Sequence, residues 1–146
     1  MNNVMDQLEL TVSRTISAPR AAVFEAWLSP RTLAKIMRPS AGDGPARVTN
    51  EPVEGGRFEI VMTTADKKEI PHTGTYLEVD PHRRLAFTWA SPHSLDDSVV
   101  TIDFAESGPQ ATEITLHQVK FRSEQARDGH VRGWTTILDA LEGAVA

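Results

Sequence analysis

The feature that most constrains the fold is a series of short alternating runs between residues 46 and 119. In each run apolar and polar side chains take turns, which is the period-two pattern of a strand with one buried face. Turn-forming or charged clusters separate the runs at residues 54–56, 65–68, 80–81, 91–96 and 107–109. The spacing predicts an antiparallel meander of about six strands, and residues 8–16 have the same pattern and add a seventh.

One face of the predicted sheet is apolar and must be covered, while the other carries polar side chains that suit contact with water. The residues predicted on the apolar face are Phe58, Ile60, Met62, Leu77, Val79, Leu85, Phe87, Trp89, Val100, Ile102, Phe104, Ile114 and Leu116. The last segment, residues 130–146, can supply the cover because its apolar residues recur at helical spacing. That stripe consists of Val131, Trp134, Leu138, Leu141 and Val145.

Two short helices are predicted between the first strand and the meander, over residues 19–28 and 30–37. Apolar residues recur at helical spacing in the first helix, for which Ser17 is a candidate cap. Ser29 and Pro30 suit the N-cap and the first position of the second helix. Residues 39–45 are rich in Gly, Ala, Pro and Ser and are predicted to form a loop. The expected fold class is therefore α+β, with a sheet of about six to seven strands and a long last helix.

Composition narrows the classes of function. The chain has 146 residues, which suits one domain over residues 1–146. A net charge of −5 without a basic stripe argues against a nucleic-acid partner, and no apolar run is long enough to span a membrane. The first ten residues lack the basic and apolar regions of a secretion signal, so a cytoplasmic location is expected. The absence of cysteine excludes disulfides and thiolate sites.

The sequence contains no motif for metal binding or catalysis. The histidines fall in or beside predicted turns and ends, or on the polar face, and no pair has metal-ligand spacing: His72, His82, His93, His117 and His130. No set of nucleophile, base and orienting group is evident among the polar residues near the turns, Ser94, Asp96, Asp97 and Glu106. The stretch at residues 42–44 lacks the Lys and Ser or Thr of a phosphate loop. We therefore predict no metal, no cofactor and no catalytic residue.

Five stretches taken together resemble one protein family. They are RTISAPRAAVFEAWLSPRTL near the start, EGGRFEIVM, GTYLEVDPHRRLAFTW, the Thr-rich strand ATEITLHQV and the terminal HVRGWTTILDAL. They resemble the bacterial proteins related to the C-terminal domain of the activator of Hsp90 ATPase (AHSA1-like). These proteins fall within the START-like (SRPBCC) superfamily, which includes polyketide cyclases and plant allergens. The resemblance covers residues 8–144.

The resemblance implies a helix-grip fold, in which a curved antiparallel sheet wraps a long C-terminal helix and two short helices close one end. Such folds commonly keep a largely apolar cavity between the sheet and the helix. The leading hypothesis that follows is a protein that encloses a small hydrophobic or amphipathic molecule there. Where the family often carries a Trp after the second Pro of the helical segment, this chain has Ile36 and Met37.

A cavity of this kind has a predictable lining of mostly apolar residues with a few polar groups. Gln118 continues the alternation of its strand, so its side chain is predicted to point inward; the alternative is that it lies at the end of the strand and reaches solvent. A glycine inside a helix costs about 1 kcal/mol relative to alanine, so Gly133 needs a reason. One reason is that a ligand or strand comes close to the helix beside Trp134, and the alternative is that both residues serve only core packing. For His130 the alternatives are the pocket rim and a capping or surface role. The predicted ligand-binding residues are Trp27, Phe58, Ile60, Met62, Phe87, Trp89, Gln118, His130, Trp134 and Leu138.

Two alternative functions stay open. The resemblance to the family's namesake implies that the outer surface of the fold can engage a chaperone such as Hsp90. A cyclase-type or lyase-type enzyme would use the same cavity with a polar cluster deep inside it, for which Gln118 and His130 are the candidates. The oligomeric state also stays open: edge strands of an open sheet can pair between chains to form a homodimer, although no particular residue points to one.

Overall fold

The computed structural model describes residues 8–38, 44–92 and 94–145. Within these ranges the chain forms seven strands and three helices. In chain order they are β1 (Glu9–Ile16), α2 (Arg20–Ala26), α3 (Pro30–Ile36), β2 (Gly44–Asn50), β3 (Arg57–Thr63), β4 (Glu69–Asp80), β5 (Arg84–Thr88), β6 (Val99–Glu106), β7 (Thr112–Val119) and α4 (Glu124–Val145). Of the predicted features, residues 1–7, residues 39–43 of the loop and His93 lie outside the described residues.

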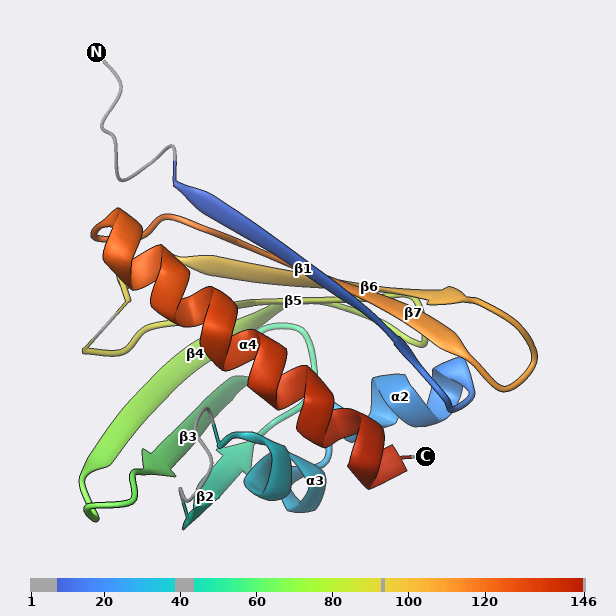
Figure 1. Cartoon of the computed structure of the whole chain (residues 1–146), viewed down its shortest axis with the longest axis horizontal. Coiled ribbons are helices and arrows are strands. Elements are labelled where there is room, and N and C mark those ends of the chain that lie inside the picture. The colour runs from blue at the N-terminus through green and yellow to red at the C-terminus, as the bar shows by residue number, and fades with distance from the viewer. Residues whose placement is uncertain (1–7, 39–43, 93, 146) are drawn as a thin grey trace.

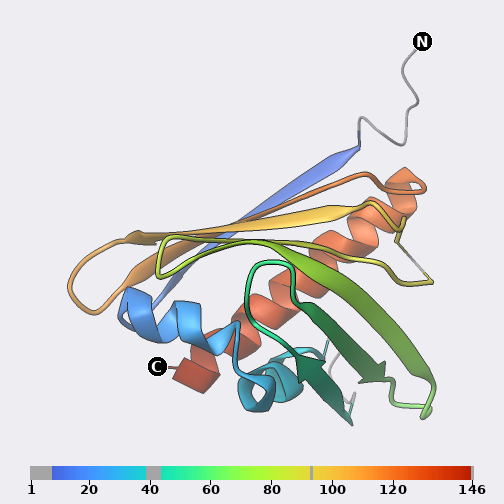
Figure 2. The same ribbon diagram turned by 180° about the vertical axis from the view of Figure 1, so that it is seen from behind.

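The strands form one antiparallel sheet in the order β1-β7-β6-β5-β4-β3-β2. Consecutive strands from β2 to β7 are neighbours, and β1 joins the far edge beside β7, where Glu9 lies opposite Val119. Figures 1 and 2 show the sheet curling around α4, which crosses its inner face, with α2 and α3 near the C-terminal end of α4. This arrangement confirms the predicted α+β helix-grip fold.

The sheet bends within β4 because this long strand changes partner along its length. Residues 69–75 pair with β3 and residues 76–80 pair with β5, with an irregularity in register between Tyr76 and Glu78 that marks a β-bulge. Gly74 lies at the bend, where an added Cβ atom would stand 2.0 Å from the carbonyl oxygen of Thr88. Glycine is therefore the residue that lets the two strands approach at this point.

Because of the bulge, the predicted alternation of buried and exposed residues in β4 is wrong at one position. The alternation predicts Leu77 on the apolar face, but its side chain is 48% exposed, and Tyr76 is buried instead at 3%. One additional residue at the bulge shifts the alternation, while Val79 still packs against the core. His72 is a second correction, because it lies inside β4 and is buried, where the sequence places it beside a turn.

Helix α4 covers the apolar face as predicted, but it begins six residues earlier than expected. Its buried residues are Trp134, Ile137, Leu138 and Leu141, and Val131 and Val145 are partly buried. The helix starts at Glu124, and the Oγ atom of Ser123 accepts a hydrogen bond from the Ala126 N–H at 3.1 Å. The apolar stripe does not reach these first turns, so the period in the sequence does not mark them.

Both short helices form where they are predicted. Ser29 caps α3 as expected, because its Oγ atom accepts a hydrogen bond from the Thr32 N–H at 3.2 Å. The prediction of Ser17 as the cap of α2 is wrong: Pro19 is the N-cap residue, and no side-chain hydrogen bond caps this helix. Ser17 lies two residues before that position, outside the place from which a side chain reaches the first-turn N–H groups.

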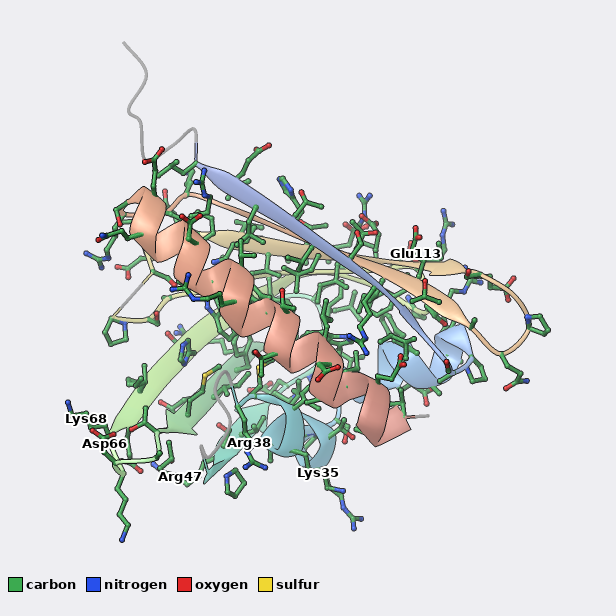
Figure 3. All side chains as sticks on the ribbon, in the orientation of Figure 1. Lys35, Arg38, Arg47, Asp66, Lys68 and Glu113 are labelled. Carbon is green, nitrogen blue, oxygen red and sulfur yellow. The ribbon has the colours of Figure 1, made fainter. Side chains whose placement is uncertain are left out.

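Charged side chains project outward at the end of the sheet that β2 and the β3–β4 turn form. Figure 3 shows Arg47, Asp66 and Lys68 at this end. Arg47 forms an ion pair with Glu69, and Lys68 with Asp66 at 3.9 Å. These exposed pairs balance one another in solvent and contribute little to stability.

Candidate functional site

An open pocket of about 460 Å³ lies between the N-terminal half of α4 and the inner face of the sheet. It is bordered by β3 and β4, by the chain that follows β5, and by the segment that leads into α4. The lining residues are Met62, Ile70, His72, Trp89, Pro92, Arg122, Ser123, Gln125, Ala126, Gly129, His130, Gly133, Trp134 and Ile137. Helices α2 and α3 lie toward the other end of α4 (Figure 1).

Aromatic rings form the firm wall of this pocket. The ring centroids of Trp89 and Trp134 are 5.0 Å apart, and both residues are only 2% exposed. The imidazole of His72 lies against Trp89 with a centroid separation of 4.7 Å. Because core packing fixes these rings, they give the pocket a preformed apolar surface.

Small residues make up much of the α4 side of the pocket. Ala126, Gly129 and Gly133 all line it, at helical spacings of three and four residues. Larger side chains at these positions would extend into the space that the pocket occupies. Gly133 lowers helix stability by about 1 kcal/mol relative to Ala, and the space beside Trp134 stays open as a result.

His130 lines the pocket while its ring nitrogens contact other protein groups. Its Nδ1 atom lies 2.7 Å from the carbonyl oxygen of Ala126, and its Nε2 atom lies 2.8 Å from Oγ of Ser94. In the neutral ring this geometry assigns the proton to Nδ1, so that Nε2 accepts a hydrogen bond from the serine hydroxyl. Of the two alternatives for His130, the structure places its side chain in the pocket lining.

The separation of Ser94 and His130 is that of a nucleophile and its base. However, Ser94 is fully buried and does not line the pocket. A main-chain carbonyl, not a carboxylate, holds the other ring nitrogen of His130. The pair therefore fastens the chain after β5 to α4. Sequence reasoning missed this contact because 36 residues separate the partners and no local motif marks them.

Gln118 takes part in a buried hydrogen-bond chain outside the pocket. Its Oε1 atom accepts a hydrogen bond from Nε1 of Trp134 at 2.7 Å, and its Nε2 atom donates to Oγ of Ser98 at 2.9 Å. Ser98 in turn donates to the carbonyl oxygen of Val119 at 2.7 Å. Gln118 points inward as its parity predicts and is fully buried. Both ends of its amide already have partners within the protein.

The predicted site residues divide into groups that lie in different places. Met62, Trp89, His130 and Trp134 line the pocket. A second group surrounds a small inner void of about 10 Å³, enough for roughly one water molecule; it comprises Trp27, Phe58, Ile60, Phe87 and again Trp89. Gln118 and Leu138 border neither space.

Two indole groups near the inner void have buried donors without a protein acceptor. Among the described residues, Nε1 of Trp27 and Nε1 of Trp89 make no hydrogen bond. Tyr76 borders the same void, and its hydroxyl accepts a hydrogen bond from Asn50 at 3.1 Å. Burial raises the pKa of Tyr76 above its ordinary value, because desolvation disfavours the tyrosinate.

The residues that sequence reasoning missed come mainly from two segments. These are the polar start of α4 and the strand interior of β4, and the residues are Ile70, His72, Pro92, Arg122, Ser123, Gln125, Ala126, Gly129 and Ile137. The alternation and the apolar stripe select residues that face a core, whereas a pocket wall also includes small and polar residues. The spacing of Ala126, Gly129 and Gly133 is the signal in the sequence that marks this wall.

In the described ranges, no group of three or more His, Asp and Glu residues is arranged to hold a metal ion. In the same residues, no helix is both long and apolar enough to cross a bilayer.

Comparison with known proteins identifies the family. The model of the family described as activator of Hsp90 ATPase homolog 1-like protein matches residues 17–146. The chain belongs to this family. The AHSA1-like match therefore includes both short helices, strands β2 to β7 and α4, which is most of the helix-grip fold. No curated protein matches the chain.

Solved structures share the AHSA1-like fold of this chain. A crystal structure of a protein from Chromobacterium violaceum has a TM-score of 0.85 at 24% identity, covering 94% of this chain and 96% of that one. The solution structure of an AHSA1-like protein from Aeromonas hydrophila has a TM-score of 0.76 at 27% identity, covering 93% and 90%. A crystal structure of a protein from Mesorhizobium loti has a TM-score of 0.74 at 25% identity, covering 93% and 95%.

Proposed function

We propose that this AHSA1-like protein binds a small, predominantly apolar molecule in the pocket beside the N-terminal half of α4. The observation that carries the proposal is the volume of the pocket together with its lining. A volume of about 460 Å³ falls within the range of roughly 300 to 1,000 Å³ that small-molecule sites occupy. The wall formed by Trp89 and Trp134 offers a flat apolar surface, and the polar groups are few.

The polar groups of the pocket support binding more than turnover. His130 is held between the Ser94 hydroxyl and the Ala126 carbonyl oxygen. Gln118, the other candidate for a catalytic role, is satisfied by Trp134 and Ser98 away from the pocket. A cyclase-type or lyase-type reaction would need a reactive group that faces the substrate, and neither side chain supplies one in this arrangement.

A pair of glycine variants on one helix tests the proposal. Gly133 lines the pocket, whereas Gly143 lies outside it, and a Cβ atom added to Gly143 would meet no atom within 4 Å. We expect Gly133→Leu to fill the pocket and to weaken binding of the neutral fluorescent probe N-phenylnaphthylamine by about tenfold or more. Gly143→Leu changes the same residue type and is expected to bind the probe like the unchanged protein.

The titrations are read from probe emission, with circular dichroism used to verify that both variants are folded. Equal binding by the two leucine variants would place the probe elsewhere and contradict the proposal. Native mass spectrometry of protein purified gently from a homologous host gives an independent measurement. A non-covalent adduct that is lost on denaturation is expected, and a bare mass together with no probe binding would overturn the proposal.

A second candidate function is interaction with a chaperone such as Hsp90, which the description of the family suggests. Val53 and Leu77 are large apolar side chains that are 59% and 48% exposed. Main-chain hydrogen bonds of 2.8 Å join Gly55 and Gly56 to Tyr76, so the Val53 loop runs beside the strand that carries Leu77. A contact there predicts that Val53→Asp with Leu77→Asp abolishes any change in the Hsp90 ATPase rate. An Hsp90 rate that the unchanged protein does not alter counts against this function.

A further inference from the structure

We propose that the molecule bound in this pocket is a hydrophobic carboxylic acid whose carboxylate is recognised by the guanidinium of Arg122. This inference rests on the proposed function and adds the chemical class of the ligand. It follows from the charges that line the pocket, from the contacts of Arg122 and from the position of the start of α4.

The charge of the pocket lining differs in sign from that of the whole protein. The chain has 20 acidic and 15 basic residues and a net charge of −5. The pocket lining nevertheless contains no Asp or Glu, and Arg122 is its permanently charged residue. A negatively charged group on the ligand would therefore meet a cation there and no carboxylate of the lining.

Most N–H donors of the Arg122 side chain make no hydrogen bond among the described residues. Within the described residues it forms no ion pair, and its one hydrogen bond runs from Nη2 to the carbonyl oxygen of Ser94 at 3.5 Å, which is long. The neighbouring cations differ: Lys120 pairs with Asp97 at 2.8 Å and Arg127 with Asp128 at 3.2 Å. A guanidinium has five N–H donors in a planar fork that matches the two oxygens of a carboxylate.

The start of α4 adds a positive potential at the same edge. This helix runs for 22 residues from Glu124, and the pocket is lined by Ser123, just before the helix, and by Gln125 and Ala126 of its first turn. Aligned peptide dipoles place a partial positive charge at a helix N-terminus, which favours an anion nearby. Glu124 lies in this turn but does not line the pocket. The dipole supports Arg122 and is secondary to it.

The remainder of the pocket sets the character of the rest of the ligand. Trp89, Trp134 and Ile137 offer apolar surface on the inner side, while Arg122 is exposed. A ligand with its apolar body against the tryptophans can keep its acidic group near the guanidinium and solvent. The guanidinium fork can pair with both oxygens of a singly charged carboxylate, whereas the described lining holds no second Lys or Arg to balance a doubly charged phosphate.

Two probes that differ in charge and hardly in shape test this inference: phenylbutanoate and the neutral phenylbutanamide, each titrated by calorimetry. The unchanged protein is expected to bind the acid about tenfold more tightly than the amide. Arg122→Gln should remove that preference by weakening acid binding about tenfold, with amide binding unchanged. Arg122→Lys keeps the charge without the fork and should fall between them. Arg127→Gln is the matched control and should leave both affinities unchanged.

Each result has a distinct meaning. Equal affinities for acid and amide in the unchanged protein, or acid binding that Arg122→Gln does not weaken, would overturn the inference and leave the proposed function standing. Loss of amide binding in Arg122→Gln would show a structural effect of this substitution and would also overturn it. If neither these probes nor N-phenylnaphthylamine binds the unchanged protein, the proposed function falls together with the inference.

Discussion

Replacing Trp134 with Phe is expected to destabilise the protein more than replacing Trp89 with Phe. Both tryptophans are 2% exposed, and both substitutions remove the same atoms from the ring. They differ at the indole nitrogen: Nε1 of Trp134 donates to Oε1 of Gln118 at 2.7 Å, whereas Nε1 of Trp89 makes no hydrogen bond among the described residues. Trp134→Phe therefore leaves the buried Gln118 oxygen without its donor.

The magnitude follows from this unpaired oxygen. The cost of the smaller ring is similar in both variants and largely cancels in the comparison. A buried acceptor left unsatisfied costs about 1 to 3 kcal/mol, which is the expected difference between the two free energies of unfolding. Since 1 kcal/mol corresponds to about 2 to 4 °C for a chain of this size, Trp134→Phe should melt roughly 2 to 12 °C below Trp89→Phe.

Urea unfolding followed by circular dichroism measures these free energies without relying on tryptophan emission. The two variants should have the same dependence on urea concentration, so that the shift in midpoint reports stability alone. Trp27→Phe is a second control, because Nε1 of Trp27 also lacks a partner among the described residues. Equal destabilisation by Trp134→Phe and Trp89→Phe would refute the reasoning, as would a larger loss in Trp89→Phe.

Three further predictions concern pH, backbone approach and capping. Burial raises the pKa of the single tyrosine, Tyr76, above 10.0, so the unfolded chain loses this proton at a lower pH than the folded protein does. The free energy of unfolding, measured in urea, should therefore fall above about pH 10, and it should fall less in Tyr76→Phe. Gly74→Ala places a Cβ atom 2.0 Å from the Thr88 carbonyl oxygen and should cost about 1 to 3 kcal/mol or more in urea unfolding, while Gly143→Ala should not destabilise. Ser29→Ala removes the side-chain cap of α3 and should lower the free energy of unfolding, measured by calorimetry, by about 1 kcal/mol.

The architecture could be predicted because one face of the sheet is buried and the other is exposed to solvent. Under that condition the alternation in the sequence fixes strand positions, and the stripe of Trp134, Leu138 and Leu141 identifies the covering helix. The prediction failed at Leu77, where a bulge adds a residue. The isolated glycine at position 74 is the local sign of such an irregularity, but periodicity alone does not tell which neighbour shifts.

The site was less predictable than the fold, because its contacts join distant parts of the chain. Parity places Gln118 inward, yet only the tertiary structure makes Trp134 and Ser98 its partners. The apolar pattern also selects every core aromatic alike. It cannot separate Trp89, which borders the pocket, from Phe87, which borders only the inner void.

The order of the strands has a consequence for synthesis on the ribosome. Strand β1 is synthesised before the other strands, but its partner in the sheet is β7. Glu9 can pair with Val119 only after β7 has been synthesised. The inner face of the sheet then stays uncovered until α4, with Leu138 and Leu141, has also emerged. The nascent chain therefore carries apolar side chains without their cover until α4 has emerged, and a chaperone that shields them until this helix docks would raise the yield of folded protein.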